Sequence, residues 1–180
     1  MSVFTNPAHR SGEDARAYTS AVLELLGARN PLDVLPATPD AVRHAVAGLS
    51  EAELSRPEAP GKWSMRHVVR HLADSEIVWG YRLRMVLAHN RPSLTGYDQD
   101  LWADRLQYGS ANVADAIGEL AALRRTHVGL LRAASTADLQ RVGVHSERGE
   151  ESVAHMLRMY AGHDLLHLAQ LARVRRAVAA

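Results

Sequence analysis

Apolar residues recur at helical spacing along most of the chain. In five segments every third or fourth position is apolar, and no segment shows a sustained alternation of apolar and polar residues. We therefore predict an all-α protein whose last four helices form an up-and-down four-helix bundle, accompanied by short extra helices. The expected helices are 11–26, 38–50, 64–89, 110–134 and 150–178.

Helix-capping and helix-breaking residues set the expected boundaries. Thr38-Pro39-Asp40 is typical of a helix N-terminus, so Pro31 and Pro36 are expected in a turn before it. Ser64 is expected to cap the helix that follows it. Ser50 and Glu53 form a capping-box pattern, which predicts a short helical turn between helix 38–50 and helix 64–89.

Two longer connections interrupt the helical pattern. Residues 92–109 contain several aromatic and acidic side chains and are expected to form a long connection with one short helix. Connections of this length in compact domains are often functional. Residues 135–139 are expected to add a turn, and residues 143–149 a second loop.

Composition places the chain among ordinary globular proteins and restricts its chemistry. A length of 180 residues suits a single domain, 1–180, and the net charge is +1 with arginines dispersed among acids, which argues against nucleic acid as a partner. No cysteine is present, so a transition metal could be held only by histidine and carboxylate. The chain lacks a long apolar run or a leader-like start, so we expect a cytoplasmic protein without membrane contact.

Two histidine pairs suggest a metal site. His163 and His167 are four residues apart on one predicted helix, about 40° apart in azimuth, so both imidazoles can reach one ion. His67 and His71 form a second pair on helix 64–89. Because bundle cores often assemble metal sites from facing helices, the two pairs together are a credible set of ligands.

Four motifs in order resemble the DinB-like superfamily, in its YfiT-type branch. The similarity covers the chain from about Asn30 to the C-terminus, and the motifs are Gly61-Lys62-Trp63-Ser64, His71-Leu72-Ala73-Asp74-Ser75-Glu76, Gly96-Tyr97-Asp98-Gln99-Asp100 and His163-Asp164-Leu165-Leu166-His167-Leu168-Ala169-Gln170. The resemblance implies a four-helix bundle, often dimeric, with one divalent nickel or zinc ion bound by His71, His163 and His167.

The resemblance also implies two kinds of activity. Members are described as metal-dependent hydrolases, or as transferases and isomerases that use low-molecular-weight thiols such as bacillithiol or mycothiol; DNA binding is not implied. Three histidine ligands leave at least one open coordination position, which is typical of a catalytic site and could hold water or a thiol. We expect a small-molecule substrate and a homodimer. The alternative is a non-catalytic metal-binding bundle with a structural, sensor or thiol-binding role.

Several residues near these motifs have more than one interpretation. His67 departs from the family pattern and is a fourth ligand, a group next to the ligands, or a solvated histidine. Gln170 faces the cleft to orient water or substrate, or is an ordinary polar residue near a helix end. Asp74 accepts a proton from an imidazole, or forms an ion pair with an arginine. Glu76 is a general base or, as we favour because its azimuth is about 140° from that of His71, pairs with an arginine such as Arg158 or Arg82.

The remaining candidates have weaker support. Asp98 and Asp100 act near the cleft mouth or, as we favour, form a turn or helix cap. Large aromatic residues line a substrate pocket or belong to the core, and these are Trp63, Trp79, Trp102 and Tyr160. The other histidines have no motif support and are expected to be surface or structural residues: His44, His89, His127, His145 and His155.

Overall fold

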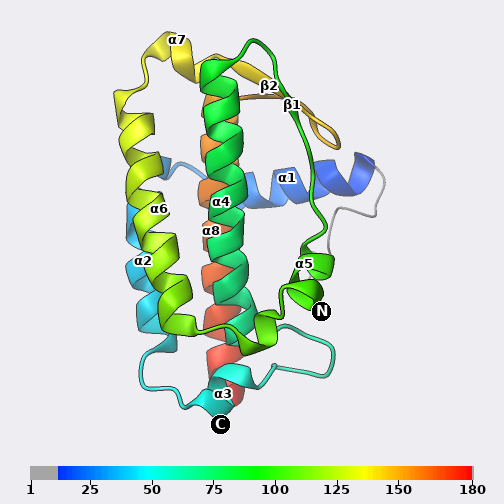
Figure 1. The fold of residues 1–180 in the computed structure, drawn as a ribbon, viewed down its shortest axis with the longest axis vertical. Helices are drawn as coiled ribbons and strands as arrows, with labels where there is room; N and C mark the ends of the chain where they lie inside the picture. The colour runs from blue at the N-terminus through cyan, green and yellow to red at the C-terminus, as the bar shows by residue number, and fades with distance from the viewer. Residues whose placement is uncertain (1–11, 180) are drawn as a thin grey trace.

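The computed structural model describes residues 12–179 and confirms the predicted four-helix bundle (Figure 1). Its helices are α2 (Pro31–Val46), α4 (Met65–Ala88), α6 (Val113–Ala133) and α8 (Val153–Val178). Each buries an apolar stripe against its neighbours, as the helical periodicity requires. No helix in the described range has an apolar stretch long enough to cross a membrane.

The direction of the helices departs from strict alternation at one point. Arg70 of α4 bonds Glu119 of α6, and Glu76 further along α4 bonds Arg124 further along α6, so these two helices run parallel. The connection 89–112 therefore returns along the bundle before α6 begins (Figure 1). The sequence predicted a long connection here, and its length is what allows the return.

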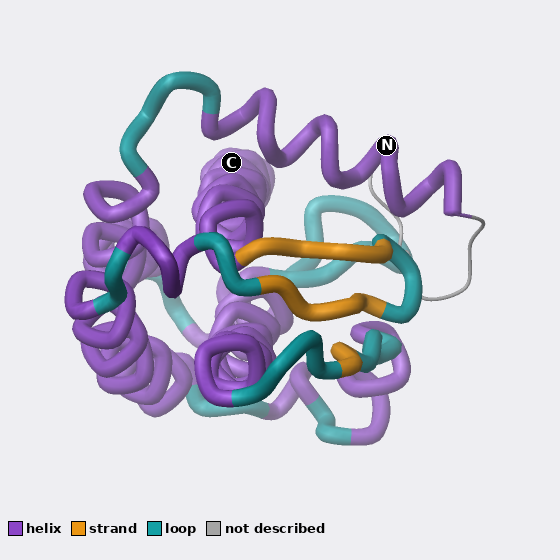
Figure 2. Tube along the Cα trace, turned by 90° about the horizontal axis from the view of Figure 1, so that it is seen from above, coloured by secondary structure: helices purple, strands orange, loops and turns teal. Residues whose placement is uncertain are grey.

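Helix α1 (Gly12–Leu26) lies across the bundle and packs on α8 (Figures 1 and 2). The contact is close at Gly162, where a Cβ atom would lie 2.0 Å from the carbonyl oxygen of Val22. Glycine is therefore required at this position of α8 for α1 to approach. The segment before Gly12 lies outside the described residues.

Short helices occupy the connections. They are α3 (Glu51–Ser55), α5 (Gln99–Arg105), the 3₁₀ helix η2 (Tyr108–Ser110) and α7 (Thr136–Leu139). The predicted capping box of α3 is present, because Ser50 Oγ accepts from the backbone N–H of Glu53 and the Glu53 carboxylate accepts from that of Ser50. Ser64 is the N-cap of α4, but its hydroxyl bonds the His67 side chain, and no side-chain cap bond to the backbone forms.

The predicted start of α2 is wrong. The helix begins at Pro31 and not at Pro39, with Asn30 accepting a hydrogen bond from the backbone of Leu32. Proline at the first helical position lacks an N–H that would be unpaired there in any case. Pro39 has no N–H to offer the Leu35 carbonyl, and that oxygen instead accepts a 2.7 Å bond from Arg124 Nη1. A contact from another helix thus replaces the lost backbone bond.

A small sheet that the sequence did not predict covers one end of the bundle (Figure 2). Its strands are β1 (Ser93–Leu94), β2 (Val142–His145) and β3 (Gly149–Ser152), in the order β1-β2-β3. β1 pairs with β2 in parallel, with Ser93 opposite Val144, and β2 pairs antiparallel with β3, with Val142 opposite Ser152. Strands this short show no measurable alternation, which is why the loop 143–149 and a helix starting at 150 were expected.

The core divides into two apolar clusters with a polar layer between them. One cluster includes Leu72, Leu120 and Leu171, and the other includes Leu83, Val128 and Leu157. On α4, α6 and α8 all the buried polar residues except Arg66 fall between these clusters: His71, Asp74, Ser75, Glu76, Arg124, His127, Asp164 and His167. The candidate chemistry therefore lies in the middle of the bundle.

Candidate metal centre

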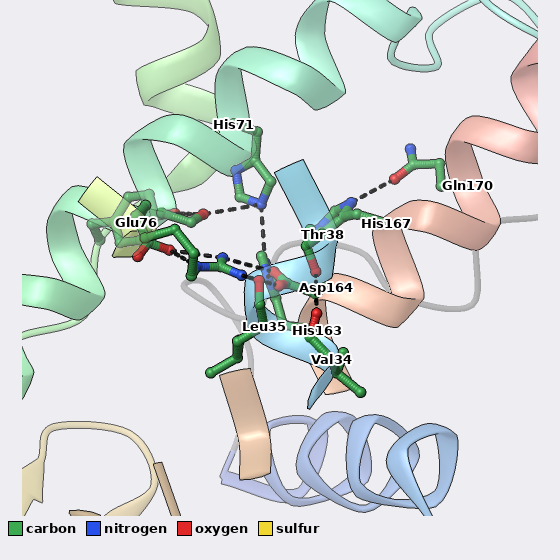
Figure 3. A network of polar contacts seen from close by, with 12 residues as sticks. Val34, Leu35, Thr38, His71, Glu76, His163, Asp164, His167 and Gln170 are labelled. Atoms are coloured by element: carbon green, nitrogen blue, oxygen red, sulfur yellow. Dashed lines mark hydrogen bonds and ion pairs between the residues drawn. The ribbon is translucent and has the colours of Figure 1, made fainter. Parts of the chain in front are cut away.

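Three histidines from two helices meet in this polar layer (Figure 3). His71 belongs to α4, whereas His163 and His167 are one turn apart on α8, and one ring nitrogen of each lies within 4.8 Å of the others. Nε2 of His71 is 3.3 Å from Nε2 of His163. His71 is 1% exposed and His167 8%, while His163 is partly exposed. The helices thus bring together the three residues that the motifs singled out.

Burial keeps two of these imidazoles, His71 and His167, in the neutral form that binds metal. Desolvation, together with the nearby His167 and His163, lowers the pKa of His71 well below its usual value. Desolvation and the neighbouring His163 also lower the pKa of His167 to about 3. Three imidazoles that converge in this way suit a divalent transition metal, and no other described His, Asp or Glu joins the cluster.

Gln170 contacts a ligand candidate directly. Its Oε1 lies 2.8 Å from Nδ1 of His167 and accepts the N–H there, which leaves the Nε2 lone pair of that ring for a metal (Figure 3). The sequence had suggested that the Gln170 amide orients water or substrate in the cleft. Its oxygen instead accepts a hydrogen bond from the imidazole of His167, one turn earlier on α8.

Of the two interpretations of Asp74, the structure shows the ion pair with an arginine. Its carboxylate bonds the guanidinium of Arg70, which also donates to Glu119 at 2.7 Å. No hydrogen bond joins Asp74 to His71 within the described chain, and Nδ1 of His71 has no partner there. Asp74 therefore does not fix the tautomer of His71 in this structure, because its carboxylate is bonded to Arg70, one turn earlier on α4.

Two hydroxyl groups next to the histidines were missed by sequence reasoning. Ser75 Oγ lies 3.3 Å from Nε2 of His71 and 2.9 Å from the hydroxyl of Tyr97. Burial raises the pKa of Tyr97, so its hydroxyl stays protonated at neutral pH. The signals were present: Ser75 is one helical turn after His71, and Tyr97 belongs to the motif in the long connection.

A buried ion network lies directly behind the histidines. Arg124, 1% exposed, donates to Glu76 at 2.9 Å and to Asp164 at 2.6 Å, and His127 Nδ1 lies 2.6 Å from the second oxygen of Glu76. Although burial acts to raise the pKa of Asp164, Arg124 lowers it below the usual value, so the group stays ionised. Its Oδ1 is 4.0 Å from Nδ1 of His163.

The partners expected for Glu76 were therefore wrong. Glu76 pairs with Arg124, whereas Arg158 and Arg82 bond backbone carbonyls elsewhere. The helix α6 runs parallel to α4 and places Arg124 beside Glu76. The signal for Arg124 was its position on the apolar stripe of helix 110–134, four residues after Leu120. A charged residue at a core position calls for a buried partner of opposite charge.

A pocket of about 150 Å³ opens onto the three histidines. One wall is aromatic, since Trp79 and Tyr160 stack with ring centroids 4.3 Å apart. These two residues are both core and pocket wall, whereas Trp63 packs against the His71 ring at 5.0 Å and Trp102 against Tyr97 at 4.5 Å. The volume suits a small ligand, or the reacting end of a larger one.

The other predicted residues lie outside the cluster. Nδ1 of His67 is 2.8 Å from Ser64 Oγ, and this half-buried ring lines a separate groove, so it is not a fourth ligand. Asp98 caps α5 by accepting from two backbone N–H groups, and Asp100 lies in the first turn of that helix. The remaining histidines divide by burial: His127 and His145 are buried, His155 is intermediate, and His44 and His89 are exposed.

Comparison with known families agrees with this architecture. The profile of the DinB superfamily matches residues 35–171, so the chain belongs to that superfamily. The structure of YfiT from Bacillus subtilis, described as "a probable metal-dependent hydrolase with an unusual four-helix bundle topology", superposes with a TM-score of 0.77. It is 22% identical and covers 96% of this chain and 92% of its own.

Two bacterial relatives extend the similarity to sequence. A protein of Oceanobacillus iheyensis is 29% identical over 133 residues, which are 74% of this chain and 77% of its own. One of Geobacillus thermodenitrificans is 27% identical over 177 residues, or 98% of this chain and 92% of its own. Both carry the name "Putative metal-dependent hydrolase".

Proposed function

We propose that this protein is a divalent-metal-dependent enzyme, either a hydrolase or a low-molecular-weight-thiol S-transferase. His71, His163 and His167 would hold the ion, which we propose to be nickel or zinc. The observation that carries this proposal is the convergence of three imidazoles, two of them buried and one partly exposed, at a pocket, without a fourth imidazole or carboxylate among the described residues. A site closed by four protein ligands would instead favour a structural role.

The chemistry divides between the ion and the chain. When bound, the ion would supply a Lewis acid and lower the pKa of a coordinated water or thiol. Gln170 holds the tautomer of His167, and the hydroxyls of Ser75 and Tyr97 can hydrogen-bond a reacting group beside His71. Trp79 and Tyr160 exclude water from one side.

The two reactions have different support. The names of the relatives favour hydrolysis. Thiol transfer is supported by the family resemblance, and because the chain has no cysteine, a thiol nucleophile would have to be a second substrate. In hydrolysis the activated water would attack a carbonyl carbon; in transfer the thiol sulfur would attack an electrophilic carbon and displace its leaving group.

Activity profiling distinguishes these reactions. Nickel-loaded and zinc-loaded protein is assayed with activated esters and amides, and in parallel with small thiols plus 1-chloro-2,4-dinitrobenzene. We expect turnover in one panel that is lost in His163→Ala and kept in His44→Ala, an exposed histidine. Turnover that survives in His163→Ala would contradict the proposal, as would its absence from both panels.

We also propose that the protein is a cytoplasmic homodimer. Exposed apolar side chains on α4, Ile77 at 44% and Tyr81 at 63%, are one turn apart and could take part in such a contact. Sedimentation equilibrium should give twice the chain mass. A mass of 19.7 kDa, that of one chain, would contradict the dimer.

A further inference from the structure

Arg82 and His145 line the pocket outside the three-histidine cluster, and each has a buried N–H donor without a partner. These donors are Nε of Arg82 and Nε2 of His145; Nε1 of Trp79, in the aromatic wall, is a third, and none of them has an acceptor among the residues that the structure places. Leaving a buried donor unpaired is costly, so such atoms often mark the place of a ligand.

His145 lines the pocket, and a backbone hydrogen bond holds its ring in one orientation. The residue is 2% exposed and ends strand β2. Its Nδ1 accepts a 3.2 Å hydrogen bond from the backbone N–H of Glu147, and in the neutral ring this places the proton on Nε2. Desolvation and the nearby Arg148 and Arg82 lower the pKa of His145 to about 3, so the ring is a neutral donor at pH 7.

Arg82 is fixed on the same face of α4 as the metal-site residues. His71, Ser75 and Arg82 all line the pocket, at spacings of four and seven residues that keep them on one side of a helix. The backbone positions of His71 and Arg82 are about 16 Å apart along the axis, and both side chains reach into the intervening space. One guanidinium N–H of Arg82 already donates to the Thr95 carbonyl, which leaves Nε for a ligand.

Arg82 carries a positive charge that is not in an ion pair with any described carboxylate, which favours an anionic acceptor. Arg148 lines the pocket as well, but its charge is compensated by Glu151, with bonds from Nε and Nη2. Glu147 is a further acid at the rim, where its carboxylate lies against Gly96, so that a Cβ there would be 2.4 Å from Oε1. Burial and the charge of Arg148 lower the pKa of Arg82, as expected where positive charge lacks a close counterion.

We infer that Arg82 and His145 bind a carboxylate of the substrate. This inference rests on the proposed metal-dependent function and makes it more specific: the substrate is a small elongated molecule with a carboxylate at one end and its reacting group at the histidines. Two N–H donors to one carboxylate are a common arrangement for binding that group.

The test uses paired ligands that differ only in the carboxylate. Cobalt-loaded protein is titrated with ω-mercaptocarboxylates, from mercaptoacetate to 8-mercaptooctanoate, and with the corresponding amides, and binding is followed by the thiolate-to-cobalt absorption band. For at least one chain length we expect the carboxylate to bind at least about tenfold more tightly than its amide. Equal affinity at every length would overturn the inference.

Variants identify the donors. Arg82→Met and His145→Asn should abolish the carboxylate preference, since asparagine can accept from the Glu147 N–H but does not reach the Nε2 position. His145→Gln, which can place an N–H near that position, should retain part of the preference, and Arg84→Met on the exposed side of α4 should retain all of it. Circular dichroism and cobalt uptake verify that each variant is folded. A preference that persists in both Arg82→Met and His145→Asn would overturn the inference.

A second readout does not depend on metal. The metal-free protein labelled with ¹⁵N-histidine is titrated with hexanoate and with hexanamide, and the His145 Nε2–H signal, assigned by its loss in His145→Asn, should shift with hexanoate only. No shift with either compound would contradict the carboxylate site even if cobalt binds. A shift with hexanoate in a protein that takes up no cobalt would contradict the metal function and leave the carboxylate site supported.

Discussion

At the scale of single residues, the amide of Gln170 determines which nitrogen of His167 carries the proton. Because Oε1 of Gln170 can only accept, Nδ1 of the ring must donate, and Nε2 is left with its lone pair. Groups that orient a histidine ligand in this way raise its affinity for metal without touching the ion. Gln170 is thus a positioning residue.

Replacing Gln170 with leucine should weaken metal binding. We expect the affinity for zinc to fall about 10- to 100-fold in Gln170→Leu, measured by competition with a chromophoric chelator, because the imidazole loses its orienting bond. Gln170→Glu, which keeps an acceptor, should remain close to the parent protein. Gln140→Leu, at an exposed glutamine, serves as the matched control, and unchanged affinity in Gln170→Leu would contradict the role.

The buried histidines should make the metal-free protein sensitive to mild acid. The folded-state pKa of His167 and of His145 is about 3, below the ordinary value of 6.5, and that of His71 is also lowered. The unfolded chain therefore binds more protons between pH 6.5 and 3, and stability falls as the pH decreases through this window. Urea denaturation of metal-free protein at a series of pH values measures the effect, and a constant midpoint from pH 7 to 4 would contradict it.

The sequence predicted which three histidines come together, but not all of their surroundings. His71, His163 and His167 could be named because i,i+4 spacing and motif position are properties of the chain itself. The Arg124 partner of Glu76 could not be named, because it depends on which residues of α6 face α4. The Arg70 partner of Asp74 lies one turn away on α4 itself, so helical periodicity could have indicated it. Ser75 was within reach of helical periodicity, whereas the position of Tyr97 depends on the path of a long connection.

At the scale of elements, the contact of α1 with α8 depends on a missing side chain. The backbone of α1 at Val22 occupies the space that a Cβ on Gly162 would need. Gly162 directly precedes His163, so the same turn of α8 holds α1 on one side and presents a ligand on the other. A change in this packing should therefore affect both stability and the site.

Gly162→Ala should destabilise the protein. An added methyl group 2.0 Å from a backbone oxygen forces α1 or α8 to move, at a cost of about 1–3 kcal/mol in the free energy of unfolding. Gly129→Ala is the matched control, because no atom lies within 4 Å of a Cβ at that helical position, and it should be neutral or more stable by up to about 1 kcal/mol. Denaturant titration of both variants measures this, and equal stability of the two would contradict the packing argument.

Local patterns predicted the long helices better than their connections. The apolar stripes of α4, α6 and α8 and the capping box of α3 depend only on residues that are close together in the sequence. The early start of α2 was missed because proline inside a helix predicts a break, whereas the Leu35 carbonyl that Pro39 leaves unpaired finds a partner in Arg124 of α6. The sheet was missed because β1 and β2 are joined by long-range pairing.

At the scale of the whole molecule, one buried arginine connects the four bundle helices. Arg124 of α6 bonds Glu76 of α4, Asp164 of α8 and the Leu35 carbonyl of α2. A guanidinium can satisfy all three because its donors point in several directions. This network fixes how far each helix is shifted along its neighbours. One of its members, Asp164, lies close to His163.

Removing Arg124 should be strongly destabilising. Arg124→Met leaves two buried carboxylates without their cation, and we expect a loss of about 3–5 kcal/mol in the free energy of unfolding at neutral pH. Arg125→Met, at the exposed neighbour, should change it by less than about 0.5 kcal/mol. Similar stabilities for the two variants in urea denaturation would show that the network does not hold the bundle together.

The central claim is that His71, His163 and His167 together bind one divalent metal ion. Metal analysis of the purified protein by inductively coupled plasma mass spectrometry, after loading and removal of free ion, tests it most directly. The account predicts one equivalent of zinc or nickel per chain in the parent protein and in the exposed control His44→Ala, and none in folded His163→Ala. A folded parent protein without metal, or an unchanged metal content in His163→Ala, would contradict it.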